Sequence, residues 1–129
     1  MKVLVLSDGK LKEKEIDNTL EELQKIVGGY IEFPLLGGIF KKNIIDTIIN
    51  EEGKFIEGLK PEIALIDGET KRILDIVYGN CIFASHDEKG NTIGLNEKQI
   101  KVVMQELQMD ITLTYQDSGK EFVVKALFL

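Results

Sequence analysis

The sequence has few of the residues on which catalytic and metal sites most often depend. Its 129 residues include one histidine, one cysteine and no tryptophan. A single cysteine, Cys81, excludes an internal disulfide, and one histidine plus one cysteine fall short of the several ligands of a protein zinc site. Cys81 lies in an apolar run with no basic neighbour, which is typical of a small buried residue. We therefore predict no metal, no cofactor and no cysteine nucleophile.

Arginine is also scarce, and acidic residues outnumber the numerous lysines. The formal net charge is −6, and Arg72 is the one arginine. Binding to a nucleic-acid backbone requires clustered Lys or Arg, whereas the lysines here are interleaved with acids, as in residues 10–15 (KLKEKE). We therefore expect no direct contact with nucleic acid.

Long apolar runs are missing as well. No run approaches the roughly 20 residues that a membrane span needs, and Met1-Lys2 leads into a short apolar run without the pattern of a signal peptide. We expect a cytoplasmic protein that does not contact a membrane. With 43% hydrophobic residues, the chain can bury one core, which predicts a single domain over residues 1–129.

What the sequence does contain is a helix with clear end signals. Asn18 followed three residues later by Glu21 has the spacing of a capping box. Gly28 and Gly29 supply the positive-φ positions that end a helix. We predict a helix over about residues 19–27, followed by a strand that begins at Tyr30.

A second helix is predicted over about residues 97–107. Asn96 is its expected N-cap and Gln99 the partner in the capping box. The residues after the box follow the i, i+3, i+4, i+7 spacing of one apolar face, which would pack on the core; they are Ile100, Val103, Met104 and Leu107.

Short strands account for most of the remaining chain. Seven to nine are expected, with a tight hairpin or bulge at Gly37-Gly38 and a hairpin that turns at residues 50–54. Two strands meet around an interruption at residues 78–80. The order of elements lacks strict βα alternation, so we predict an α+β fold in which both helices pack on one face of a mainly antiparallel sheet.

The last predicted strand, residues 122–129, is apolar almost to its end. Such a strand would be buried on both faces or would lie against a second subunit. At a sheet edge it would invite pairing with another chain. We therefore expect a homodimer formed through this C-terminal strand.

Two tyrosines that adjoin glycine suggest a binding site. A tyrosine offers a flat apolar face and a hydroxyl, so it suits contact with a small ligand or a protein; the alternative is that both rings pack at the edge of the core with their hydroxyls in water. The candidate ligand- or partner-binding residues are Tyr30, Glu32, Arg72, Tyr78, Gly79 and Asn80.

His86 stands beside Asp87 at the mouth of a predicted turn. It could act as a general base or metal ligand, but we interpret it as a solvated turn histidine. None of the serines lies in a nucleophile-elbow motif. We predict no catalytic residue.

Several blocks of the sequence resemble the domain-of-unknown-function family 3846. The similarity extends from the first strand to the second helix and does not include residues 111–129. The blocks cover residues 16–24, 26–32, 50–54, 76–80 and 95–100. The resemblance implies a protein of phages, conjugative elements and Gram-positive gut bacteria, in a family with no established activity.

Three functions are compatible with these observations. The favoured one is a non-enzymatic accessory binding protein, involved in counter-defence, that binds and inhibits a host protein. The alternative is a protein that sequesters a small nucleotide signal, with Tyr30, Tyr78, Asn80 and lysines or Arg72 around the ligand. The third is a small enzyme that uses His86 or carboxylates.

Overall fold

The computed structural model describes residues 1–34, 36–108 and 112–129. These contain ten strands and three α-helices, so the α+β fold class is confirmed, with more strands and one more helix than expected. The helices are α1 (Leu20–Val27), α2 (Gly38–Lys42) and α3 (Glu97–Gln108), and η1 (Gly53–Phe55) is a 3₁₀ turn. The strands are β1 (Lys2–Ser7), β2 (Lys10–Glu15), β3 (Ile31–Glu32), β4 (Ile45–Asn50), β5 (Pro61–Ile66), β6 (Ile73–Tyr78), β7 (Cys81–His86), β8 (Thr92–Ile93), β9 (Thr112–Asp117) and β10 (Lys120–Phe128).

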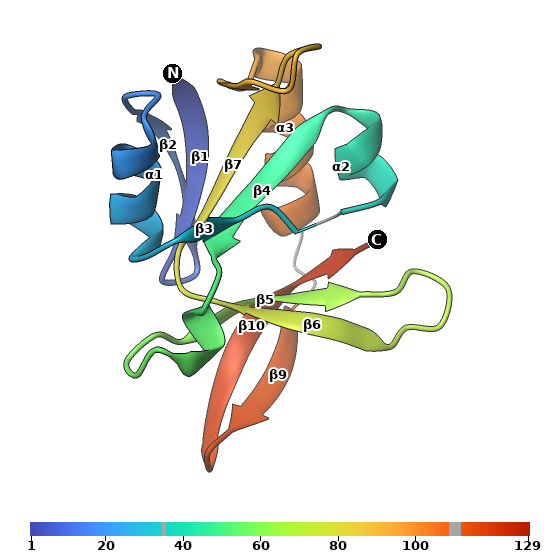
Figure 1. Cartoon of the computed structure of the whole chain (residues 1–129). Coiled ribbons are helices and arrows are strands. Elements are labelled where there is room, and N and C mark those ends of the chain that lie inside the picture. The colour runs from blue at the N-terminus through green and yellow to red at the C-terminus, as the bar shows by residue number, and fades with distance from the viewer. Residues whose placement is uncertain (35, 109–111) are drawn as a thin grey trace.

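The strands form two sheets rather than one (Figure 1). The six-stranded sheet has the order β2-β1-β7-β4-β3, with β8 beside β7, and its pairs are antiparallel. The four-stranded sheet has the order β6-β5-β10-β9, in which β5 and β10 run parallel. The two sheets separate at the predicted interruption, because β6 ends at Tyr78 in one sheet and β7 begins at Cys81 in the other.

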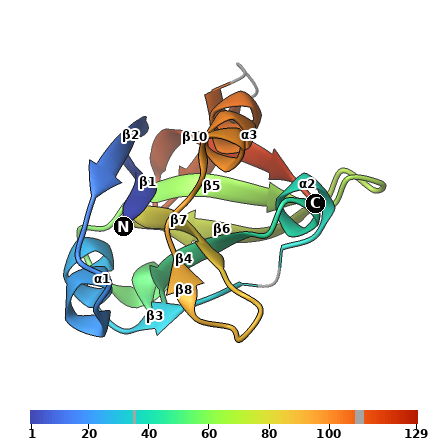
Figure 2. The same ribbon diagram turned by 90° about the horizontal axis from the view of Figure 1, so that it is seen from above.

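The helices α1 and α3 lie on opposite faces of the six-stranded sheet, so the prediction of one shared face was wrong (Figure 2). Alternate residues of β1 show the reason. Val3 and Val5 pack in the cluster with α1, and Leu4 and Leu6 pack in the cluster with α3. The sequence of a central strand that is buried on both faces is a continuous apolar run. For this reason it does not show on which face a helix packs.

The main core lies between the two sheets and α3. Ile63 of β5 and Leu127 of β10 share one buried cluster with Leu4 and with Phe83 of β7. Phe40 of α2 meets Phe83 edge to face, with ring centroids 5.8 Å apart. The four-stranded sheet therefore covers the α3 side of the six-stranded sheet.

The start of α1 is shifted by one residue from the prediction. Thr19 is the N-cap, and its Oγ1 accepts a hydrogen bond from the N–H of Glu22 at 3.2 Å. Asn18 instead donates from Nδ2 to the main-chain oxygen of Thr92 at 2.8 Å. At the other end, Gly28 has the expected positive φ of 85°, whereas Gly29 does not. Gly29 is needed for space, because a Cβ there would lie 2.9 Å from Asn50 Nδ2.

Neither predicted hairpin in the segment 37–56 forms. Gly37 is the N-cap of α2, and Gly38 is its first residue. Phe40 in this helix is completely buried against the core, and its burial stabilises the helical turn. After β4, Asn50 Oδ1 accepts from the N–H of Glu52 at 2.8 Å, and the chain enters η1 instead of a returning strand.

The C-terminal strand is not at an edge. β10 is hydrogen bonded to β5 on one side and to β9 on the other. We expected a dimer because an unpaired edge of this strand would bind a second chain. The strand is instead paired within the chain. The alternation of Ile111, Leu113 and Tyr115 with threonines predicts the strand before it, which forms as β9. Ile111 lies outside the described residues.

Candidate functional site

The predicted site residues do not assemble into one site. Arg72 and Tyr78 lie at opposite ends of β6, about 20 Å apart along an extended strand. Tyr30 is 72% exposed. Glu32 and Tyr78 both line one shallow depression of about 230 Å³. Tyr30, Glu32 and Arg72 are exposed, whereas Tyr78 and Asn80 are partly buried and Gly79 is buried. The residue pattern could not show which of these residues lie together.

Two of the predicted residues have structural roles. Asn80 Nδ2 donates to the main-chain oxygen of Ile26 at 3.0 Å, and Asn50 Nδ2 donates to that of Val27 at 3.1 Å. Both oxygens belong to the last turn of α1, whose carbonyls have no partner within the helix. Gly79 has φ +86°, and a Cβ there would lie 3.1 Å from Leu59 Cδ1. Asn80 and Gly79 thus hold α1 and the passage between the sheets in place.

Tyr78 has a partner of its own. Its hydroxyl donates to Asp117 Oδ2 at 2.7 Å. Burial, together with this hydrogen bond to a carboxylate, raises the pKa of Tyr78. The ring packs against the buried cluster of the four-stranded sheet. Tyr78 therefore stays a neutral donor at physiological pH and joins β6 to the end of β9.

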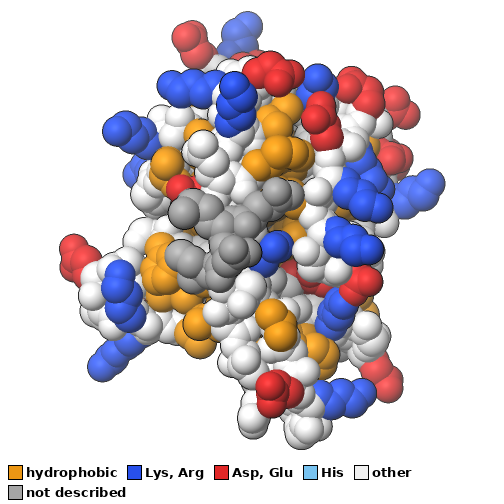
Figure 3. Space-filling model, turned by 180° about the vertical axis from the view of Figure 1, so that it is seen from behind, with side chains coloured by type: hydrophobic (Ala, Val, Ile, Leu, Met, Phe, Trp, Pro, Cys, Tyr) orange, Lys and Arg blue, Asp and Glu red, His pale blue; other side chains and the backbone are white. Residues whose placement is uncertain are grey.

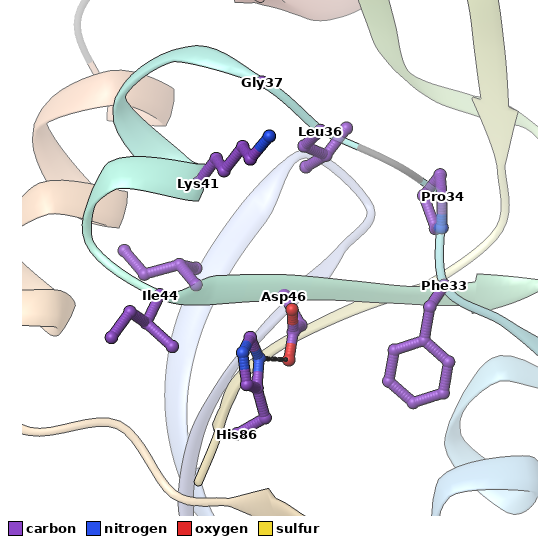
Figure 4. A pocket seen from close by; sticks show the side chains of 9 residues that line it. Phe33, Pro34, Leu36, Gly37, Lys41, Ile44, Asp46 and His86 are labelled. Atoms are coloured by element: carbon purple, nitrogen blue, oxygen red, sulfur yellow. Dashed lines mark hydrogen bonds and ion pairs between the residues drawn. The ribbon is translucent and has the colours of Figure 1, made fainter. Parts of the chain in front are cut away.

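A different cavity combines apolar walls with ionisable groups (Figure 4). It has a volume of about 450 Å³ and lies where the chain passes from β3 through α2 into β4. It is lined by Phe33, Pro34, Leu36, Gly37, Lys41, Ile44, Ile45, Asp46 and His86.

His86 and Asp46 form a pair at this cavity. His86 Nδ1 lies 2.8 Å from Asp46 Oδ2. Asp46 pairs with Ala84 in the ladder of β4 and β7, so the side chain two residues beyond Ala84 is its diagonal neighbour on the same face. His86 is solvent exposed, as predicted, but it ends a strand and does not lie in a turn.

Asp87, the neighbour in sequence, serves a separate turn. Its Oδ1 accepts from the N–H groups of Asn91 and Lys89, each at 2.9 Å. These hydrogen bonds, first that from Asn91, lower the pKa of Asp87. The partner of His86 is 40 positions away in the sequence, so no local signal could have identified it.

Ile44 forms a strained part of the cavity wall. It has φ +57°, a left-handed conformation that is unusual for a β-branched residue. Its carbonyl oxygen accepts hydrogen bonds from Ser85 Oγ at 2.7 Å and from Gln99 Nε2 at 3.3 Å. Its side chain is 49% exposed. Buried polar groups therefore hold an apolar side chain partly in solvent.

The hydrogen bonds to the main-chain oxygen of Ile44 belong to a network that includes the N-terminal cap of α3. The predicted capping box is confirmed: Asn96 Oδ1 accepts from the N–H of Gln99 at 2.8 Å, and Gln99 Oε1 accepts from that of Asn96 at 2.9 Å. The amide nitrogen of Gln99 also donates to Ser85 Oγ at 3.0 Å. One glutamine side chain thus caps α3 and fixes the rim of the cavity.

The cavity combines apolar side chains with the pair of His86 and Asp46. Of the described side chains that line it, none carries a hydroxyl or thiol. Ser85 points to the opposite face of β7 from His86, toward Gln99. Cys81 is fully buried in the core, and burial raises the pKa of its thiol. Within residues 1–34, 36–108 and 112–129, no three His, Cys, Asp or Glu side chains come together as metal ligands.

A second cavity, of about 560 Å³, lies beside Tyr78. Phe55, which is 86% exposed, and Phe122 line it together with Lys54, Lys60 and Lys120. Lys54 pairs with Asp75, and Lys60 pairs with Asp8. On the face seen in Figure 3, basic and acidic side chains are interspersed.

Comparisons with known proteins place the chain in a family. No described helix is long and apolar enough to cross a membrane. Neither the curated proteins nor the solved structures include a match to the chain. The profile of the family described as Domain of unknown function (DUF3846) matches residues 1–108, which end with α3, so that β9 and β10 lie beyond the match. The chain therefore belongs to the DUF3846 family.

Proposed function

We propose that the protein is a non-enzymatic binding protein whose partner protein docks on the cavity beside β4. The observation that supports this is the strained conformation of Ile44, whose main-chain oxygen is hydrogen bonded by Ser85 and Gln99 and whose side chain is half-exposed at the cavity. Strain of this kind persists only when the surroundings hold it, and it is common at binding sites. Phe33, at 44% exposed, adds a second apolar side chain at the cavity.

The setting that we propose follows the family resemblance. The partner is a host protein in the cytoplasm, and binding inhibits it as part of counter-defence by a phage or mobile element. An inhibitor of this kind needs a rigid contact surface and no reaction chemistry. The network from Asn96 through Gln99 to Ile44 supports rigidity at the cavity.

A matched pair of substitutions tests the proposal. Phe33→Glu changes the cavity beside β4, and Phe55→Glu makes the same change at the cavity beside Tyr78. Tagged wild-type protein and both variants are used to purify partners from the cells that produce the protein. Both variants must first show the circular dichroism spectrum and Tm of the wild type.

We expect Phe33→Glu to lose the co-purifying partner and Phe55→Glu to retain it. Retention by both variants would refute docking on the cavity beside β4. A partner that is lost only with Phe55→Glu would move the interface to the other cavity.

A second candidate function rests on the cavity beside Tyr78. An almost fully exposed Phe55 offers stacking to an aromatic molecule such as a nucleotide. Lys54 and Lys60 are paired with aspartates, so the positive charge for an anionic group would come from Lys120, which has no ion-pair partner among the described residues. Sequestration of a small nucleotide signal would use this cavity. Native mass spectrometry followed by denaturation tests it: a released nucleotide near one per chain, absent from Phe55→Glu, would favour this function over protein binding.

A further inference from the structure

We infer that the protein forms a homodimer in which strand β9 of one copy pairs antiparallel with β9 of a second copy. The inference does not rest on the proposed function, because β9 belongs to the four-stranded sheet and the cavity beside β4 belongs to the other sheet. β9 is the last strand of its sheet, and within the described part of the chain it pairs with β10 alone. Figure 1 shows the β9–β10 hairpin projecting away from the six-stranded sheet.

The other strands at the ends of the two sheets each have a feature that hinders further pairing. Natural sheets protect their edges with lysines, prolines, bulges or very short strands. Lysines occupy three of the six positions of β2, β3 has two residues, and the register of β6 with β5 is interrupted twice. β9 (TLTYQD) spans six residues without lysine or proline, and its register with β10 is continuous. Among the described end strands, β9 alone lacks such protection.

The side chains of β9 leave this edge accessible. Thr112, Thr114 and Gln116 are exposed, and the residues that alternate with them are half-buried. Two of the half-buried residues, Leu113 and Tyr115, pack on the apolar cluster of the four-stranded sheet. The strand therefore presents a polar face and an apolar face, and both extend to the edge of the sheet.

The hairpin turn determines which main-chain groups of β9 point to the edge. Asp117 pairs with Lys120 across a two-residue loop, in which Ser118 and Gly119 have φ +52° and +80°. Two consecutive positive φ angles are typical of a type I′ turn. The residues that flank such a loop form a hydrogen-bonded pair, and hydrogen-bonded pairs recur at every second residue of the ladder. Every second residue of β9, counted back from Asp117, thus bonds to β10.

The remaining residues of β9 point their main-chain groups the other way. They are Thr112, Thr114 and Gln116, whose N–H and C=O groups are directed to the open edge. Each of them can exchange two hydrogen bonds with a residue opposite it on an added strand. A strand placed here would continue the ladder of the four-stranded sheet.

A second copy of β9 fits this edge. A twofold axis normal to the sheet sets residues of one face opposite residues of the same face. With Thr114 opposite its own copy, Thr112 lies opposite Gln116, so all three residues that face the edge are paired. A shift by two residues in either direction would leave one of the three without a partner on the opposite strand. The longest ladder is therefore centred on Thr114.

The side chains agree with this register. Leu113 lies opposite Tyr115 on the apolar face, where a cross-strand contact between an apolar side chain and an aromatic ring is stabilising. The polar face brings threonine and glutamine together without any charge. Asp117, the one charged residue of β9, already accepts the hydroxyl of Tyr78. A charged segment of another protein would find no ion-pair partner along residues 112–116, which favours a second copy as the occupant.

Charge substitution at the twofold axis tests the pairing. Thr114→Lys sets two lysines opposite each other, with Cα atoms about 5.5 Å apart, and Thr114→Glu does the same with two carboxylates. Sedimentation velocity at low ionic strength, where charges are least screened, measures dimer dissociation from the low micromolar range upward. Val123→Lys is the matched control, because Val123 pairs with Thr114 on β10, is 71% exposed and lies one strand away from the edge.

We expect the wild type to form a dimer. Each Thr114 variant, once it shows the circular dichroism spectrum of the wild type, should have a dissociation constant at least about tenfold higher, because like charges are brought together. An equimolar mixture of Thr114→Lys and Thr114→Glu should recover the affinity of the wild type, since opposite charges then meet at the axis. Val123→Lys should dimerise as the wild type does.

Hydrogen exchange of the wild type provides a second measurement that needs no substitution. In dilute protein the N–H groups of Leu113 and Tyr115 should already be protected by β10, and those of Thr112, Thr114 and Gln116 should exchange freely. At concentrations that favour the dimer, protection should appear at these last three residues. The change therefore has a two-residue period that follows the edge.

Four outcomes would overturn the inference. They are a wild type that stays monomeric at the highest concentration measured, a dimer that neither Thr114 variant weakens, a mixture of the two variants that does not recover affinity, and dimerisation without new protection at residues 112, 114 and 116. Equal weakening by Val123→Lys would also overturn it, because the contact would then involve the face of the hairpin and not its edge. The partner protein of the proposed function takes no part in these measurements, so their failure leaves that proposal unchanged.

Discussion

The side-chain amide of Gln99 donates to the main-chain oxygen of Asn43 at 2.9 Å, across 56 positions of the sequence. This hydrogen bond joins the first turn of α3 to the residue that ends α2. The same nitrogen serves Ile44 and Ser85, so one buried amide connects the cap of a helix to the wall of the proposed binding cavity.

Replacement of Gln99 by glutamate should separate these two roles. Gln99→Glu keeps an oxygen for the N–H of Asn96 but places a carboxylate where Asn43 and Ile44 present acceptor oxygens. We expect a loss of about 3 kcal/mol in the free energy of unfolding, because a buried charge is left without donors. Urea unfolding measures it. Lys98→Glu, on the adjacent exposed residue, is the control, and an equal loss in both variants would contradict the assigned role.

Glycine at position 44 should relieve backbone strain. Because Ile44 has φ +57°, glycine at this position removes the backbone strain. The lost burial and the greater entropy of the unfolded chain offset part of this gain. We therefore expect Ile44→Gly to raise the free energy of unfolding by between 0 and about 1 kcal/mol. Ile45→Gly, at a buried strand position, is expected to cost about 3 kcal/mol or more. Thermal unfolding of the two variants provides the comparison. A similar loss for both would show that residue 44 is not strained.

Valine at position 47 should stabilise the protein. Thr47 is 2% exposed, and its Oγ1 finds no hydrogen-bond partner in the described part of the chain. Thr47→Val removes an unsatisfied hydroxyl and keeps the shape of the side chain, so we expect a gain of about 1 kcal/mol in urea unfolding. A loss of stability would indicate that the hydroxyl is bonded in solution.

Asn80 should contribute to stability and not to binding. Asn80→Ala removes the hydrogen bond to Ile26 and should cost about 1 kcal/mol. Asn80→Asp should cost more, because a carboxylate cannot donate and is repelled by the negative end of α1. Chemical unfolding and partner binding are measured together for both variants. Loss of the partner without loss of stability would restore Asn80 as a binding residue.

Glu62 should make stability depend on pH. The residue is 5% exposed, and its Oε1 accepts from the N–H of Gly9 at 2.8 Å. Burial raises the pKa of Glu62 above its usual value, so the folded state holds the proton more tightly than the unfolded state. Ionisation of Glu62 therefore lowers stability as the pH rises from the unfolded pKa, about 4.5, through the folded pKa, and the loss persists above it.

Glu62→Gln keeps the acceptor for Gly9 and removes the charge. The variant should exceed the wild type in Tm at pH 7, and the difference should shrink as the pH falls below the pKa of Glu62. Thermal unfolding from pH 4 to pH 8 measures both. A difference that does not vary with pH would mean that burial of the charge is not its cause.

The sequence predicted best where the determining contacts are local. The capping box of Asn96 and Gln99 involves residues three positions apart, and the helix that follows it forms as expected. The turn residues at positions 7–10 likewise predict that residues 11–16 pair back on residues 2–6, and β1 and β2 form this hairpin. In both cases the hydrogen-bonding partners are neighbours in the sequence, so the residue pattern is sufficient.

Prediction failed where burial depends on distant segments. The turn of α2 forms because Phe40 meets Phe83, which is 43 residues further along the chain. The pair of Asp46 and His86 depends on the ladder between β4 and β7. Asn80 is of a residue type that often binds ligands, yet its side-chain amide is hydrogen bonded to the last turn of α1. Residue type alone does not show whether a polar group has already been satisfied.

The parallel pairing of β5 with β10 affects how the protein folds. Each half of the four-stranded sheet is a hairpin of neighbouring strands, and hairpins form within about 1–10 μs. Joining them requires Ile63 to meet Lys125, which closes a loop of about 60 residues. Contacts between such distant residues slow folding. We therefore expect a late folding event in which the β9–β10 hairpin docks, and until then the inner edge of β5 is exposed to association with other chains.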